Sequence, residues 1–194
     1  MNICVFCSSS NGIDDCYFDA ANQLGKLIGE RGHNLINGGS NVGLMEASAL
    51  ATKAANGKAY GIIPEAIHER GLGSKTSDEL LVTPNMRERK YLLRKKSDAF
   101  IALPGGFGTL EEILEVITLK QLQYHSKAIV FINTNGFYNP LIEQFERSYH
   151  ESFAKEVYRK LYFVTDSEEE AMEYIENYQP EDVDTKWHKV PEKK

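Results

Sequence analysis

The 194-residue chain has few cysteines and no long apolar run, and each shortage excludes a class of protein. Its three cysteines, Cys4, Cys7 and Cys16, are an odd number crowded at one end, unlike a disulfide framework. No apolar stretch approaches the roughly 18 residues of a membrane-spanning helix. The N-terminus has neither the basic region nor the cleavage site of a signal peptide, so we expect a cytoplasmic protein without a membrane partner.

An excess of positive charge is also lacking. The chain carries 22 basic and 28 acidic residues, a net charge of −6, which argues against nucleic acid as a partner. Cys4 and Cys7 form a C-x-x-C pair, but Cys4 falls inside an apolar strand, and no second pair has the spacing of zinc ligands. The five histidines are scattered, so we expect neither a metal nor a cofactor.

Short apolar runs alternate with amphipathic segments along the chain. The expected strands are residues 3–6, 33–37, 58–63, 80–83, 99–103, 128–132 and 161–164. The expected helices are residues 17–30, 85–96, 110–123, 141–153 and 167–178. One further helix is expected to be opened by the turn at 38–46 and to last to about residue 55. This alternation predicts a single α/β domain over residues 1–178, a doubly wound parallel sheet with helices on both faces. Residues 65–78 are expected to cross the surface, and residues 179–194, around Trp187, to form a polar tail.

The stretch 103–112, L-P-G-G-F-G-T-L-E-E, joins the apolar strand at 99–103 to a helix. A strand, a glycine-rich turn and a helix N-terminus in succession direct free backbone N–H groups and a positive helix end at one point, which suits a phosphate. The glycines allow close approach to a ligand and positive φ angles. Alternatively, Thr109 and Glu112 form a capping box with a purely structural role. The stretch lacks the lysine of a P-loop and the spacing of G-x-G-x-x-G.

Two further polar, glycine-containing loops follow expected strands, at residues 8–12 and 38–46. Ligands of parallel sheets bind beyond the carboxyl ends of the strands. We therefore expect these loops and residues 104–112 to converge on one cleft.

A basic helix is expected to begin after Asn85, with Asn85 as N-cap and Glu88 three residues on. It holds six cations in a chain that is acidic as a whole: Arg87, Arg89, Lys90, Arg94, Lys95 and Lys96. Without further information, this pattern is that of a solvated basic face.

Several of these segments together resemble one family. Residues 104–112 resemble the P-G-G-x-G-T-x-x-E signature of the LONELY GUY family, the cytokinin riboside 5′-monophosphate phosphoribohydrolases, which are often mislabelled as lysine decarboxylases. Residues 86–90, M-R-E-R-K, are similar to the family's M-x-x-R-K segment, and residues 38–45 to its upstream G-G-S-x-x-G-L-M segment. Residues 135–138 and Lys186-Trp187 fit its later portions, so the resemblance covers nearly the whole chain.

The resemblance implies a Rossmann-like fold, a homodimer, and hydrolysis of the N-glycosidic bond of nucleoside 5′-monophosphates to a free base and ribose 5-phosphate. The implied substrates are AMP and N6-modified AMP, such as cytokinin riboside 5′-monophosphates. The implied catalytic pair is Arg89 and Glu112. Substrate-binding positions are then expected at Gly39, Ser40, Met45, Glu46, Met86, Arg89, Lys90, Pro104, Gly105, Gly106, Phe107, Gly108, Thr109, Leu110, Glu111 and Thr118.

The residue chemistry fits this reaction without a metal. Cleavage of an N-glycosidic bond develops positive charge on the ribose, which a carboxylate such as Glu112 can stabilise while it orients or deprotonates water. Arg89 can orient Glu112, contact the nucleotide, or form only a structural ion pair. Glu46 can bind ribose hydroxyls or serve as a helix-dipole partner.

Two other functions are consistent with the same motifs. A nucleotide-binding or carrier module would use the phosphate turn without turnover. A decarboxylase would need pyridoxal phosphate on a lysine, and Lys90 is the one lysine near the predicted site.

Overall fold

The computed structural model describes residues 1–181 and 183. The strands are β1 Asn2–Phe6, β2 Asn34–Asn37, β3 Lys58–Pro64, β4 Glu79–Thr83, β5 Ala99–Ala102, β6 Ala128–Ile132 and β7 Phe163–Thr165. The α-helices are α1 Asp15–Glu30, α2 Gly43–Ala54, α3 Glu65–Ile67, α4 Met86–Lys96, α5 Phe107–Gln121, α6 Asn139–His150 and α7 Glu168–Glu176. Shorter turns of other helix types are η1 His68–Leu72, η2 Thr134–Gly136 and η3 Glu156–Leu161.

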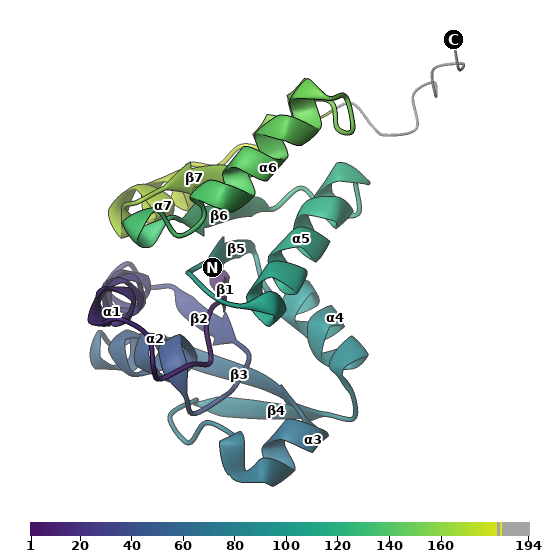
Figure 1. Ribbon diagram of the computed structural model, residues 1–194. Helices are drawn as coiled ribbons and strands as arrows, with labels where there is room; N and C mark the ends of the chain where they lie inside the picture. The colour runs from purple at the N-terminus through teal and green to yellow at the C-terminus, as the bar shows by residue number, and fades with distance from the viewer. Residues whose placement is uncertain (182, 184–194) are drawn as a thin grey trace.

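The strands form one parallel sheet in the order β4-β3-β2-β1-β5-β6-β7 (Figure 1). The chain starts in the middle, adds β2 to β4 outward on one side, then returns to place β5 against the other side of β1. Ile3 therefore pairs with Leu35 on one side and with Ala99 on the other. The order reverses between β1 and β5, where parallel α/β sheets bind their ligands.

Helices cover both faces of the sheet, as predicted. Alternate residues of β1 point to opposite faces, so that Ile3 and Val5 join the core under α1, α2 and α7, whereas Cys4 and Phe6 join the core under α4, α5 and α6. Burial raises the pKa of the Cys4 thiol far above its usual range, which makes it an inert core residue rather than a redox group.

Side chains cap two helices, and the cap at Asn85 is the one predicted from the sequence. Asn85 Oδ1 accepts a hydrogen bond from the Glu88 backbone N–H at 3.0 Å and starts α4. Ser167 Oγ accepts one from the Glu170 N–H at 3.3 Å and starts α7. These short-range signals fix where both helices begin.

Several elements differ from the expectations by two residues or more, among them α6, which spans Asn139–His150 rather than 141–153. Helix α5 begins at Phe107, with Gly106 as N-cap, so the capping box at Thr109 is wrong. The last strand begins at Phe163, because residues up to Leu161 form the 3₁₀ turn η3. The segment expected to cross the surface without periodicity folds locally into α3 and the π-turn η1.

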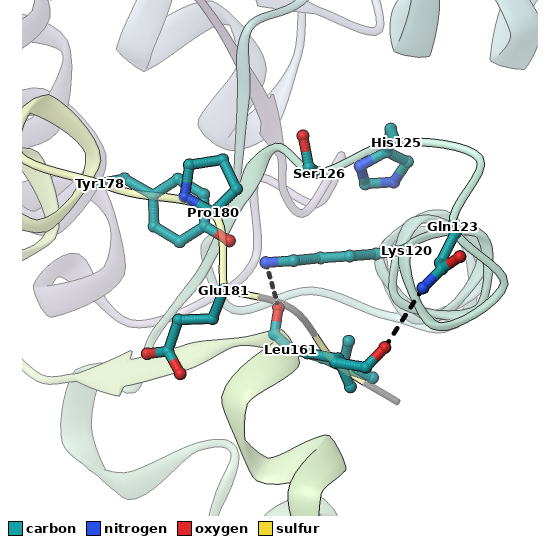
Figure 2. Close-up of a pocket in the computed structure, with 9 residues that line it drawn as sticks. Lys120, Gln123, His125, Ser126, Leu161, Tyr178, Pro180 and Glu181 are labelled. Carbon is teal, nitrogen blue, oxygen red and sulfur yellow. Dashed lines mark hydrogen bonds between the residues drawn. The ribbon is translucent and has the colours of Figure 1, made fainter. Parts of the chain in front are cut away.

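The chain after α7 returns across the C-terminal end of α5 (Figure 2). Lys120 Nζ donates to the Leu161 carbonyl at 2.8 Å and lies 4.7 Å from the centroid of the Tyr178 ring. Gln123 Nε2 donates to the Val183 carbonyl at 3.3 Å. Lys186 and Trp187, expected in the polar tail, lie outside the described residues. In the part of the chain that the structure describes, no helix is long and apolar enough to cross a bilayer.

Candidate active site

A cleft of about 650 Å³ opens at the carboxyl ends of the central strands. Its walls come from the three polar loops that the sequence predicts to converge, and backbone hydrogen bonds join these loops to one another. The Ser8 N–H donates to the Pro104 carbonyl at 3.2 Å, and the Leu44 N–H donates to the Ser8 carbonyl at 2.9 Å. The convergence predicted from strand alternation is confirmed.

The N-terminus of α5 forms one wall of the cleft. The first hydrogen bond of the helix joins the Leu110 N–H to the Gly106 carbonyl at 3.1 Å, so the N–H groups of Phe107, Gly108 and Thr109 precede the intrahelical ladder. None of the turn glycines has a positive φ, so the turn does not use the left-handed conformation that its glycines allow. Close packing requires Gly105 instead, because a Cβ there would lie 2.1 Å from Thr109 Oγ1.

The turn is held in place from behind by Tyr138. Its hydroxyl is buried and donates to the Leu103 carbonyl, the last one before the glycine turn, at 2.7 Å. The tyrosine ring packs on Phe131 of β6 with the ring centroids 5.1 Å apart. This contact fixes the position from which the helix N-terminus faces the cleft.

Arg89 and Glu112 form a buried ion pair in the floor of the cleft. The guanidinium of Arg89 donates to Glu112 Oε1, and the two side chains are only 11% and 12% exposed. Arg89 Nε also donates to the carbonyl of Ile62 in β3 at 3.1 Å. The pair therefore joins β3, α4 and α5 at one point.

Burial raises the pKa of Glu112, and the nearby guanidinium of Arg89 opposes that shift without cancelling it. A carboxyl group with a raised pKa beside a fixed cation, in a cleft, is a common arrangement at catalytic sites. Such a group can exchange a proton with water nearer neutral pH than an exposed glutamate can.

Comparison with known proteins identifies the family. A family model described as "Possible lysine decarboxylase" matches residues 45–175. A protein of Arabidopsis thaliana, "Cytokinin riboside 5'-monophosphate phosphoribohydrolase LOG5", is 38% identical over 178 residues, which cover 92% of this chain and 78% of that protein. LOG3 of the same plant is 40% identical over 178 residues, covering 92% of this chain and 83% of that protein. The chain belongs to the LONELY GUY family.

A solved structure shares the fold of this LONELY GUY chain. The molybdenum cofactor binding protein from the phototrophic bacterium Rippkaea orientalis is similar with a TM-score of 0.69 and 26% identity, over 90% of this chain and 94% of that one.

Nine of the positions expected from the LONELY GUY signature line the cleft. They are Ser40, Met45, Met86, Arg89, Gly106, Phe107, Gly108, Thr109 and Glu112. Three others support its walls from behind: Gly39 through its N–H to Asn37, Pro104 through its carbonyl, and Leu110 by packing on the core. Gly105 also supports the wall, because it packs closely against the Thr109 side chain.

The remaining expected positions lie outside the cleft lining. Glu46 accepts hydrogen bonds from Ser74 Oγ at 3.0 Å and from the Thr76 hydroxyl, so its carboxylate holds the loop before β4. Thr118 Oγ1 donates to the Leu114 carbonyl of its own helix at 2.8 Å. Their contact with substrate stays a prediction.

Lys90 and Glu111 also lie outside the cleft lining, on the outer surface between α4 and α5. Lys90 Nζ pairs with Glu111 and lies 3.6 Å from Glu115, and these contacts raise its pKa. This lysine therefore stays charged at neutral pH. Its contact with substrate likewise stays a prediction.

One wall of the cleft is formed by Ile67, Arg70 and Leu72, which are not among the positions expected from the sequence. These residues belong to α3 and η1, in the stretch without periodicity. One signal could have located them, because the stretch follows the carboxyl end of β3 and so starts at the same edge of the sheet.

In residues 1–181 and 183, no group of three or more His, Cys, Asp or Glu side chains could hold a metal ion.

The first prediction concerns Gly38, where a Cβ would lie 2.3 Å from Arg89 Nη2. We expect Gly38→Ala to displace the guanidinium from Glu112 and to lower the free energy of unfolding by about 1–3 kcal/mol. Urea unfolding measures this loss. Gly12→Ala is the matched control, because the Cβ there would contact only Ser10 Oγ, at 4.0 Å. Equal stability of the two variants would contradict the close approach.

The second prediction concerns the titration of Glu112. Because burial raises its pKa, we expect a carboxyl ¹³C NMR midpoint above the value of about 4.3 for an ordinary glutamate. Arg89→Met should raise the midpoint further, since the opposing cation is gone. The loss of the signal in Glu112→Gln assigns the resonance. A midpoint below the ordinary value would mean that the attraction of Arg89 outweighs burial.

Proposed function

We propose that this protein is a nucleoside 5′-monophosphate phosphoribohydrolase. It hydrolyses the N-glycosidic bond of AMP and of N6-modified AMP, such as cytokinin riboside 5′-monophosphates, to the free base and ribose 5-phosphate. The observation that carries the proposal is the buried Arg89–Glu112 pair in the same cleft as the N-terminus of α5. Relatives at 38% and 40% identity bear the name of this activity.

Two parts of the cleft are suited to different parts of the substrate. The free N–H groups at Phe107, Gly108 and Thr109, with the positive end of α5, suit the 5′-phosphate. Anchoring the phosphate there places the ribose over Glu112, so that binding energy from the phosphate orients the reacting carbon.

Glu112 acts on the charge that develops during bond cleavage. As the C1′–N bond breaks, its electron pair leaves with the base and C1′ becomes cationic, which the carboxylate stabilises. Water then adds to C1′ and gives one proton to Glu112. Glu112 releases that proton, directly or through water, to the departing base nitrogen, which regenerates the carboxylate and leaves neutral base and ribose 5-phosphate. Arg89 is the positioning residue, since it fixes Glu112 and favours its ionised form.

A decarboxylase fits the residues of the site less well than the hydrolase does. Pyridoxal phosphate requires a lysine amine that can lose its proton. Lys90, the lysine nearest the motif, is paired with Glu111 and Glu115 and has a raised pKa. Its environment therefore opposes Schiff base formation.

A carrier module without turnover is the second candidate. The protein of similar fold from Rippkaea orientalis is named for binding the molybdenum cofactor. Binding alone does not need a buried carboxylate of raised pKa in the cleft, so Glu112 favours the hydrolase.

A homodimer is part of the proposal. Val82 of β4 and Met86 and Tyr91 of α4 are each 44–50% accessible, and exposed apolar side chains of this size favour a protein contact. A cytoplasmic location stays a prediction from the sequence.

The third prediction tests the role of the carboxylate. We expect wild-type protein to release ribose 5-phosphate from AMP and from N6-isopentenyl-AMP, and Glu112→Gln to lower kcat at least about 100-fold while nucleotide binding persists. The ratio of the rates of ribose 5-phosphate release from the two substrates shows whether the enzyme recognises the N6 substituent. Glu143→Gln, an exposed glutamate on α6, is the control. Full turnover in Glu112→Gln would refute its catalytic role, and AMP binding without release by wild type would favour the carrier.

The fourth prediction tests the phosphate anchor. We expect adenosine to be hydrolysed far more slowly than AMP, with kcat/KM lower by at least about 100-fold, because the helix N-terminus has no phosphate to hold. Parallel assays of base release measure both rates. Equal rates for the nucleoside and the nucleotide would refute an anchoring turn.

A further inference from the structure

The wall of the cleft formed by α3 and η1 carries an arginine, Arg70, with no assigned role. Arg70 is exposed, and it lines the same cleft as Phe107, Gly108 and Thr109 at the N-terminus of α5. The turn that bears it follows the end of β3, whereas α5 follows β5 (Figure 1). The two walls therefore come from opposite sides of the switch in strand order.

Hydrogen bonds fix the turn next to the loop that follows β2. The Leu72 carbonyl accepts from the Asn41 N–H at 3.0 Å and from Ser40 Oγ at 3.2 Å. The Asn41 side-chain amide donates to the Gly71 carbonyl at 3.2 Å. Gly71 has φ +76°, so the chain reverses immediately after Arg70 in a conformation that suits glycine. Arg70 thus projects from a turn whose next two residues, Gly71 and Leu72, are hydrogen-bonded to Ser40 and Asn41. The turn is therefore anchored to the loop that follows β2.

The charges around the cleft leave Arg70 available. Arg89 is paired with Glu112, while Lys90 and Arg94 are paired with glutamates of α5. Across residues 1–181 and 183, no hydrogen bond or ion pair engages the Arg70 guanidinium. A phosphate monoester carries a charge of about −1.5 to −2 at pH 7. The helix N-terminus supplies only about +0.5, so the phosphate charge is matched only with a further cation.

We propose that Arg70 is a second phosphate ligand, whose guanidinium binds the 5′-phosphate oxygens from the side opposite to the N-terminus of α5. The inference rests on the proposed function, because it concerns the phosphate of that substrate. A guanidinium can hold two phosphate oxygens at once, which a helix N-terminus complements with its N–H groups. The phosphate is then clamped between the β3 side and the β5 side of the sheet.

The fifth prediction uses nucleotide binding, measured by calorimetry in the Glu112→Gln background so that the ligand is not consumed. We expect Arg70→Gln to weaken AMP binding about 10- to 100-fold and to leave adenosine binding unchanged, because adenosine lacks the phosphate. Arg70→Lys should recover part of the loss, since it keeps the charge but not the planar fork. Arg147→Gln is the control, because this arginine of α6 is 71% exposed and pairs with Glu151, just after the helix.

A second readout is the pH dependence of binding. The phosphate takes up its second negative charge with a pKa near 6, so AMP should bind the parent protein more tightly as the pH rises through that value. Arg70→Gln should flatten this dependence, an effect that a merely structural role of Arg70 would not produce.

Failure of this inference differs from failure of the proposed function. Unchanged AMP affinity in Arg70→Gln, or equal loss for AMP and adenosine, would overturn the phosphate role even in an active hydrolase. Selective loss of AMP binding in a protein that releases no ribose 5-phosphate would support Arg70 and refute only the hydrolase. Should Arg70→Gln fail to fold, Arg70→Lys still decides, because unchanged AMP affinity in that variant would overturn the guanidinium contact.

Discussion

The buried ion pair between Arg89 and Glu112 is the constraint on which the rest of the cleft depends. Two charges taken out of water stabilise a fold only when their geometry and remaining hydrogen bonds are good, and removing one partner typically costs about 3–5 kcal/mol. Here the Ile62 carbonyl supplies the additional acceptor. Gly38 supplies the space, because any side chain there would occupy the position of the guanidinium. The same burial gives Glu112 the raised pKa that the chemistry uses.

Sequence periodicity predicted most of this architecture, because its signals are local. Short apolar runs identified the strands, and the caps at Asn85 and Ser167 act over three residues. The start of α5 was misplaced because glycine has a low helix propensity, so the pattern suggested a turn continuing to Thr109. In the structure Gly108 lies in the first turn of α5 and lines the cleft with its backbone, because it has no side chain.

The parts of the site that the sequence did not predict depend on contacts between distant segments. Arg70 reaches the cleft because Ser40 and Asn41, some 30 residues earlier, hold its turn. The Glu46 carboxylate is engaged by hydroxyls from residues 74 and 76, which no helix-dipole argument anticipates. The similar fold of the molybdenum cofactor binding protein shows why these details matter, since a shared fold leaves function to the residues of the site.

The central position of β1 has a consequence for the order in which the molecule can assemble. Strand β1 meets β2 early in the chain, but its contact with the segment entering β5, marked by the bond between the Asn2 N–H and Asp98, closes a separation of 96 residues. Loop-closure entropy makes such distant pairings slow. During synthesis, β1 therefore remains an open sheet edge until the second half of the chain arrives, and open edges invite pairing with other chains. Ser8 and Pro104, which close the cleft, belong to opposite sides of that contact. A complete cleft is thus a sign that the two halves of the sheet have joined at β1 and β5.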